Sequence, residues 1–278
     1  MCRKLIVSQL DQSGATMDAG MMNILRVFAE CVLYNVASLT PFCVVLDSTL
    51  DDWGDSFDLL FPGDGISTSP FLGGLQVIYR VQIRTHMLLR SNTRSLDDYS
   101  VDQFRKEEIR ECSEQLDKAE RQFASLSPFC AGDGEAVTLY KAKHRVAILA
   151  ARIHLHKVAY PGATSLDHRI QSHVSKALDI LRIQDFRETG NPAMRWPFTI
   201  LACASASDED FELVKKRMQE LEEFLYGANS RKLRTAYETI GRHRADCAGI
   251  PLGFQAQGVC IQPIDFLLMP QLLDEPQV

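Results

Sequence analysis

A chain of 278 residues can bury a sizeable core, and a net charge of −6 gives it no general attraction for nucleic-acid phosphates. Hydrophobic residues make up 46% of the chain and charged residues 24%, as in ordinary globular proteins. No stretch approaches the roughly 18 consecutive apolar residues of a membrane span. We therefore expect a protein that neither binds DNA directly nor crosses a membrane.

The cysteine pattern indicates reduced, mostly buried thiols. The eight cysteines are scattered, no two form a C-x-x-C pair, and no histidine is spaced to complete a tetrahedral zinc site. The first residues turn polar after too short an apolar run to be a secretory signal. We therefore expect a nuclear or cytoplasmic protein that holds no metal and no cofactor.

The N-terminal part of the chain is expected to begin with a loose leader over residues 1–20, while residues 21–278 are expected to form one helical domain. Apolar residues at helical spacing predict a first helix within 21–45. Residues 47–68 hold six aspartates and no basic residue, so we expect a long acidic loop there. A second helix is predicted over 69–90.

The middle of the chain is predicted to supply three further helices. Residues 101–126 have an expected buried edge that begins at Phe104, and their charges alternate in sign, as on a solvated face. Residues 136–159 place their larger apolar groups on one stripe. Ser165 is expected to cap the next helix. The apolar face of that helix would hold Leu166, Ile170, Val174, Ala177, Leu178 and Leu181.

Residues 194–227 are expected to lie at the centre of the fold. The run from Trp196 to Ala206 carries no charge, so it predicts a buried helix. Ser207 and Asp210 have the S-x-x-D spacing of a helix N-cap. The helix behind that cap would bury one face, made of Phe211, Val214, Met218, Leu221 and Leu225.

These elements predict an all-α protein. A short basic helix is expected over 231–243, followed by an apolar segment over 261–269. No strand alternation and no internal repeat is visible, so neither a sheet nor a solenoid is expected. We predict an irregular array of about eight to ten helices.

No strong catalytic motif is present, and the candidate site rests on polar residues within apolar helix stripes. If the helices that carry them face one another, they would enclose an apolar cavity with a few orienting hydrogen-bonding groups, as in a small-molecule pocket. The plainer interpretation is that each is a core residue satisfied by a neighbour. The candidate ligand-binding residues are Tyr79, Gln82, His86, Tyr140, His144, Trp196 and Cys203.

The order of the motifs resembles that of a known family. The segments are SPFLGGLQVIYRVQIRTHMLLR, LYKAKHRVAILAARIHLHKVAY, HRIQSHVSKALDIL and RWPFTILACASASDEDFELVKKRMQEL, closing with DFLLM. Together they look like the fungal-specific transcription factor domain, the helical regulatory region that follows binuclear zinc cluster DNA-binding modules. The likeness covers 67–269. The six-cysteine cluster of the DNA-binding module is missing, so the resemblance implies the fold and a regulatory ancestry without direct DNA binding.

Three functions remain open at this point. The resemblance implies a regulatory domain that senses an apolar small-molecule effector or forms a homodimer or another protein contact. A second hypothesis is a secondary-metabolism enzyme or binding protein on the same scaffold, with His86, His144 or Tyr140 as acid or base for an apolar substrate. A third is an inert scaffold for protein contacts.

Overall fold

The computed structural model describes residues 18–39, 74–91, 98–125, 134–186, 192–225, 228–248 and 261–269. Within these segments the chain forms eight α-helices and two 3-10 helices and contains no strand, which confirms the all-α prediction. The predicted acidic loop at 47–68 lies outside them. The elements are α2 (Ala19–Leu39), α5 (Gln76–Ser91), α6 (Asp98–Ser125), α7 (Gly134–Ala159), α8 (His168–Ile183), η5 (Pro192–Met194), α9 (Arg195–Ala204), α10 (Asp208–Glu222), α11 (Ala228–Ala248) and η6 (Pro263–Leu267).

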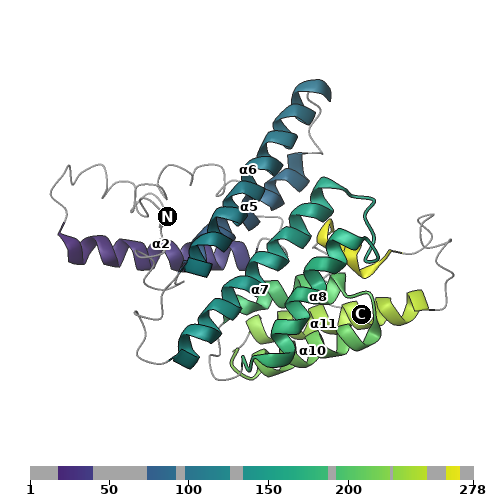
Figure 1. The fold of residues 1–278 in the computed structure, drawn as a ribbon. Coiled ribbons are helices and arrows are strands. Elements are labelled where there is room, and N and C mark those ends of the chain that lie inside the picture. Colours follow the sequence, from purple (N-terminus) through teal and green to yellow (C-terminus); the bar gives the residue numbers. More distant parts are fainter. Residues whose placement is uncertain are drawn as a thin grey trace.

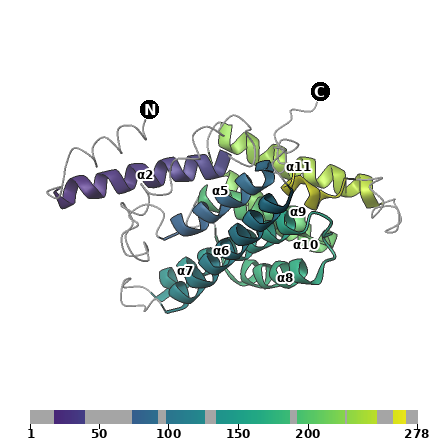
Figure 2. The same ribbon diagram turned by 90° about the horizontal axis from the view of Figure 1, so that it is seen from above.

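The helices form two connected groups around a shared interior (Figures 1 and 2). α5, α6 and α7 pack against one another, and α8, α10 and α11 gather around α9. α7 joins the two groups because it contacts both α6 and α9. α2 packs on α5 and extends outward at one edge of the molecule. Among the described helices, none combines the length and the apolar character that crossing a bilayer requires.

α9 is the buried helix that the sequence predicts. All ten of its residues are buried, and Arg195 is its only charged side chain. A helix that is apolar on every side must be covered on every side. The cover comes from α7, α8, α10, α11 and η6, all of which contact it.

α7 is a second buried helix, and more of its surface is buried than the sequence predicts. The sequence predicts one apolar stripe, yet all six residues from Val146 to Ala151 are buried. These side chains are small or aliphatic, so every face of this section can pack closely against a neighbour. α5, α6, α8 and α9 supply those neighbours.

The charged face of α6 is used partly for packing rather than for solvation alone. Arg84 of α5 pairs with Glu108 at 2.7 Å and with Glu111 at 2.6 Å. Arg152 of α7 pairs in the same way with two further carboxylates of α6, those of Asp117 at 2.7 Å and Glu120 at 2.6 Å. Each arginine therefore ties α6 to the helix beside it through two carboxylates one turn apart.

The two predicted helix caps have different outcomes. Ser207 caps α10 as expected, because its hydroxyl accepts from the Asp210 amide at 3.1 Å. The predicted Ser165 cap is wrong, since Asp167 caps α8 and accepts from the Arg169 amide at 2.8 Å. The chain is still in a turn before that point, and Leu166 is exposed rather than buried. Asp and Ser cap equally well, so the pattern alone did not select between them.

Other predicted boundaries shift for related reasons. Phe104 is 59% exposed instead of buried, because it lies near the N-terminal end of α6 at the level where α7 ends, as the hydrogen bond from Arg105 to the Val158 carbonyl shows. α11 continues to Ala248, well past the predicted end at 243. The predicted buried face of α10 is confirmed, since Phe211, Val214, Met218 and Leu221 are all buried.

A buried lysine fastens the last described element to the core. The Lys157 side chain, near the end of α7, is 1% exposed. Its ammonium donates to the carbonyls of Pro161 at 2.6 Å and Ala163 at 2.7 Å, and to the Asp265 carboxylate of η6 at 2.7 Å. Three oxygen acceptors offset much of the cost of removing this charge from water.

Lys157→Met should lower the free energy of unfolding by about 3 kcal/mol, because methionine fills the space of the stem but leaves the three acceptors without their donor. Urea denaturation followed by circular dichroism measures this loss. Lys215→Met is the matched control, since it removes a surface ion pair with Glu212 and a cation–π contact 5.8 Å from the centre of the Phe211 ring, and it should cost less than about 1 kcal/mol. Equal losses in the two variants would contradict the role given to Lys157.

Candidate functional site

The seven predicted ligand-binding residues lie on α5, α7 and α9, and six of them are buried. Tyr140 alone is half-buried. They do not form one site, because the structure distributes them over separate clusters along these helices.

The first cluster joins α5 to η5, the short helix that directly precedes α9. The Tyr79 hydroxyl donates to the Ala193 carbonyl at 3.0 Å. Its ring meets the edge of Tyr34 from α2, with ring centroids 6.1 Å apart. Burial raises the pKa of Tyr79, so the hydroxyl stays protonated and acts as a donor. Tyr79 thus has a complete structural role in holding α2, α5 and η5 together.

The second cluster contains His86 of α5 and Trp196 of α9, and the structure adds His154 of α7 to it. The rings of His154 and Trp196 have centroids 6.3 Å apart. Burial lowers the pKa of His86 to about 4. Burial, with His86 as a smaller cause, lowers the pKa of His154 to about 3. Both imidazoles are therefore neutral at pH 7.

Two polar atoms of this second cluster have no hydrogen-bond partner. They are Nδ1 of His154 and the indole Nε1 of Trp196, both fully screened from solvent. Gln82 is also buried, and it lies one helical turn before His86 on α5. A buried donor or acceptor without a partner costs about 1–3 kcal/mol, so such atoms are rare outside places where water or a ligand can reach them.

The third cluster places Tyr140 and His144 on the side of α7 that faces α6. The His144 ring lies against Phe123, with centroids 3.8 Å apart, and against Tyr140 at 4.1 Å. Nδ1 of His144 is 2.8 Å from the Tyr140 carbonyl oxygen. Burial raises the pKa of Tyr140 to about 12. This cluster is an aromatic contact between two helices.

Cys203 stands apart from all three clusters. It lies seven residues after Trp196 on α9, which is about 10 Å along the helix axis. The thiol is buried, and burial raises its pKa above its ordinary value, with Arg244 of α11 acting weakly in the opposite direction. It therefore remains a protonated, unreactive thiol.

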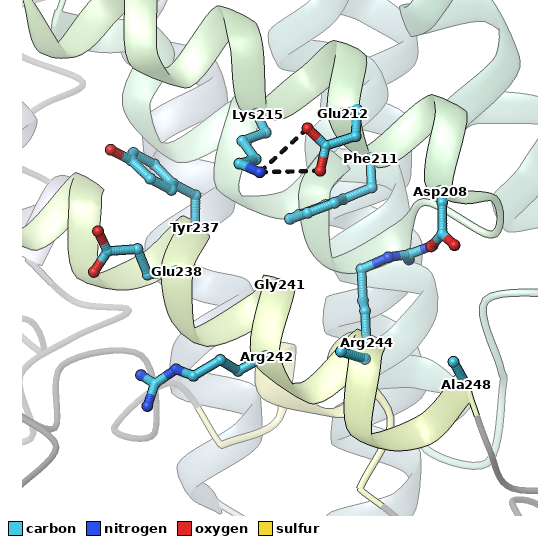
Figure 3. A pocket seen from close by; sticks show the side chains of 11 residues that line it. Asp208, Phe211, Glu212, Lys215, Tyr237, Glu238, Gly241, Arg242, Arg244 and Ala248 are labelled. Atoms are coloured by element: carbon cyan, nitrogen blue, oxygen red, sulfur yellow. Dashed lines mark hydrogen bonds and ion pairs between the residues drawn. The ribbon is translucent and has the colours of Figure 1, made fainter.

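A hollow on the surface lies between α10 and α11 (Figure 3), and none of the seven residues lines it. Its volume is about 670 Å³. The helices run antiparallel, since Asp208 at the start of α10 pairs with Arg244 near the end of α11 at 2.9 Å. Its lining residues are Asp208, Phe211, Glu212, Lys215, Tyr237, Glu238, Gly241, Arg242, Arg244, Ala245 and Ala248. We call this feature the α10–α11 groove.

The floor of the α10–α11 groove is apolar and its walls are charged. Phe211 lies below it, and a side chain at Gly241 would meet the Phe211 ring at 3.5 Å. The Arg244 guanidinium lies 5.1 Å from the centre of the same ring. A smaller hollow of about 340 Å³ adjoins the groove and shares Asp208, Arg244 and Ala248 with it.

Sequence reasoning missed both His154 and the groove. His154 falls beside the predicted stripe of α7, and only the second buried face of that helix explains its burial. A signal for the groove was present in the spacing of Gly241, Ala245 and Ala248, which places three small residues on one face of α11. The longer charged residues around them concealed it.

The prediction that all the cysteines are reduced is wrong for Cys247. Cys247 is disulfide-bonded, although its partner lies outside the described residues. Cys31, Cys112 and Cys203 are free thiols, as expected. Across the described segments, no group of three or more His, Cys, Asp or Glu side chains is placed to hold a metal ion.

The described helices define an all-α protein wrapped around two buried helices, with neutral polar clusters inside and an open groove outside. The model of the fungal specific transcription factor domain family matches residues 81–244, more than half of the chain, and the chain belongs to this family. No curated protein matched the chain. No solved structure matched it either. The family indicates a regulatory role in a fungal transcription regulator.

The buried imidazoles predict acid sensitivity. The folded state favours the neutral ring of His86, whose pKa of about 4 lies below the ordinary 6.5, so stability falls as the pH drops from about 6.5 towards 4. Between pH 7 and pH 5 this one residue should remove about 2 kcal/mol. His86→Gln should reduce that pH dependence by about the same amount, as measured by urea denaturation at the two pH values.

His168→Gln is the matched control, because the His168 side chain is 87% exposed. It should leave the difference in stability between pH 7 and pH 5 unchanged. His154 and His173, whose pKa values burial also lowers to about 3 and about 4, keep some pH dependence in both variants. An unchanged pH dependence in His86→Gln would show that this ring is not buried in neutral form.

Proposed function

We propose that this chain is the regulatory domain of a fungal transcription regulator and that it works as a homodimer paired through α2. The proposal is supported by one observation, a stripe of exposed apolar side chains on that helix. Met21 is 46% exposed, Ile24 52% and Phe28 59%, and Val27 lies beside them. We call these four residues the α2 stripe.

The α2 stripe is distinct from the face that holds α2 to the rest of the chain. Leu25, Ala29 and Leu33 are buried and follow one another at spacings of four, so they share a different face of the helix, and α2 packs on α5. The helix is therefore fixed on one side and apolar on both. Neighbouring exposed apolar residues on one helix face are typical of a protein interaction surface, whereas single ones need no explanation.

In this proposal the chain contributes to regulation without touching DNA itself. Its net charge of −6 disfavours phosphate contact, and its regulatory effect would pass through subunit pairing. Pairing of regulatory domains would bring two copies of a regulator to adjacent half-sites.

Light scattering after size exclusion should therefore find a particle of twice the chain mass of 31.3 kDa. Ile24→Glu should weaken the dimer roughly a hundredfold, because a carboxylate would be buried in the interface. Ile183→Glu makes the same change at an isolated, 79% exposed position on α8 and should leave the dimer intact. A monomeric wild-type chain would refute dimerisation.

A second candidate function, effector sensing, is favoured by the unpartnered atoms of the His86, His154 and Trp196 cluster. An apolar metabolite with a carbonyl oxygen could accept from the Trp196 indole and lie against the two neutral imidazoles, with Gln82 nearby. The three rings are almost fully buried, so such a ligand would bind a state in which α5 or α9 moves away from α7, the helix that contacts both. It would shift the population towards that state.

An effector of this class should raise the unfolding temperature, and at a hundred times its dissociation constant it should add about 2.7 kcal/mol of stability. A thermal shift screen of apolar carbonyl compounds measures this. His154→Phe should abolish the ligand-induced shift, while Tyr140→Phe, in the separate aromatic cluster, should retain it. A ligand whose effect survives His154→Phe binds elsewhere.

The enzyme hypothesis draws less support from the same residues. A general acid or base works best when its pKa lies near the working pH. The pKa of His86 is about 4 and that of Tyr140 about 12, and burial moves each away from neutrality. His144 is buried and its ring lies against the rings of Phe123 and Tyr140, which occupy the space that a substrate would need.

A further inference from the structure

We infer that the α2 stripe of one copy docks in the α10–α11 groove of a second copy, so that two copies exchange α2 reciprocally. This inference rests on the proposed homodimer and names the surface that receives the helix. It requires that the stripe and the groove match in length, chemistry and charge.

The shape of the groove suits the binding of a helix. Its two walls are antiparallel helices, and its floor is formed by the Phe211 ring and the small residues of α11. Gly241, Ala245 and Ala248 follow at spacings of four and three, which aligns them along one face of the helix. Small residues let a third helix approach closely, and the large side chains of that helix then fill the space they leave.

The lengths agree. From Met21 to Phe28 the α2 stripe extends about 10 Å along its helix. The lining residues of α11 run from Tyr237 to Ala248, which is about 16 Å. The stripe therefore fits within the groove, with a turn of α11 left over for the flanking residues.

The charges of the groove disfavour an ionic ligand and suit an uncharged one. Its walls carry three acidic residues, Asp208, Glu212 and Glu238, and three basic residues, Lys215, Arg242 and Arg244. Several are already paired within the walls, as Lys215 is with Glu212 at 3.0 Å. A nucleic acid or phosphate would find no net positive field here. The α2 segment from Met21 to Ala29 contains one charge, Arg26.

The buried area favours exchange over a simple pairing of two α2 helices. Four apolar side chains that are about half exposed offer on the order of 400 Å², whereas a stable interface buries roughly 800 Å² per partner. Pairing of α2 with α2 would bury the stripe alone. In a reciprocal exchange each copy buries both its stripe and the lining of its groove, so the area buried per copy is larger than in a pairing of the two stripes alone. Such an exchange also closes with two-fold symmetry.

Photo-cross-linking of the full chain tests the contact directly. A benzoylphenylalanine in place of Phe28 is irradiated in a mixture of nitrogen-15-labelled and unlabelled chains, and mass spectrometry locates the products. Cross-links between copies from position 28 to residues 237–248 are expected. Cross-links between copies that join α2 to α2, or cross-links within one copy alone, would overturn the inference.

Filling the groove gives a second, independent readout. Ala245→Trp places a large ring on the exposed floor and should raise the dissociation constant of the dimer at least tenfold. Ala124→Trp makes the same change at an exposed site on α6 and should have no effect. Circular dichroism checks that both variants fold.

The two tests separate the inference from the proposed function. If Ile24→Glu breaks the dimer but Ala245→Trp does not, α2 pairs elsewhere and the groove assignment is wrong, while dimerisation stands. If wild-type chains never associate, both the dimer and the exchange are wrong. If both variants dissociate the dimer and both controls leave it intact, the α2 stripe and the groove act as one interface.

Discussion

The burial of two helices on all sides constrains the rest of this structure. α9 buries all ten residues, and α7 buries every residue from Val146 to Ala151. Neither helix is stable without neighbours around its whole circumference, because apolar surface that meets water costs about 25 cal/mol per Å². The other helices therefore serve as cover, and most of them are amphipathic with one apolar face turned inward.

This arrangement also explains why the predicted residues do not converge on one site. A closely packed interior leaves little room for a ligand, so the polar groups on α5, α7 and α9 meet nearby helices instead. Tyr79 hydrogen-bonds to the carbonyl of Ala193, and His144 packs between aromatic rings. The His154 and Trp196 pair differs, because it has polar atoms that nothing in the described chain satisfies. The α2 stripe and the α10–α11 groove, which lie on the surface, are therefore the stronger candidates for binding a partner.

Sequence patterns predicted what depends on local spacing. The uncharged run at Trp196 gave the buried helix, and Ser207 gave the cap of α10, since both signals lie within a few residues. Contacts between distant segments were not readable. Asp167 caps α8 instead of Ser165, because the turn before the helix extends past Ser165 and Leu166. The exposure of Phe104 depends on where neighbouring helices end, which no local pattern encodes.

The buried ammonium of Lys157 has a consequence for the order of folding. One of its three acceptors, Asp265, follows it by 108 residues in the chain. Contacts so far apart in sequence form late, because closing a long loop costs entropy before any contact is gained. During synthesis on the ribosome, the end of α7 would therefore hold a charge that is only partly neutralised until η6 emerges. The core of this protein closes only when its final described segment arrives.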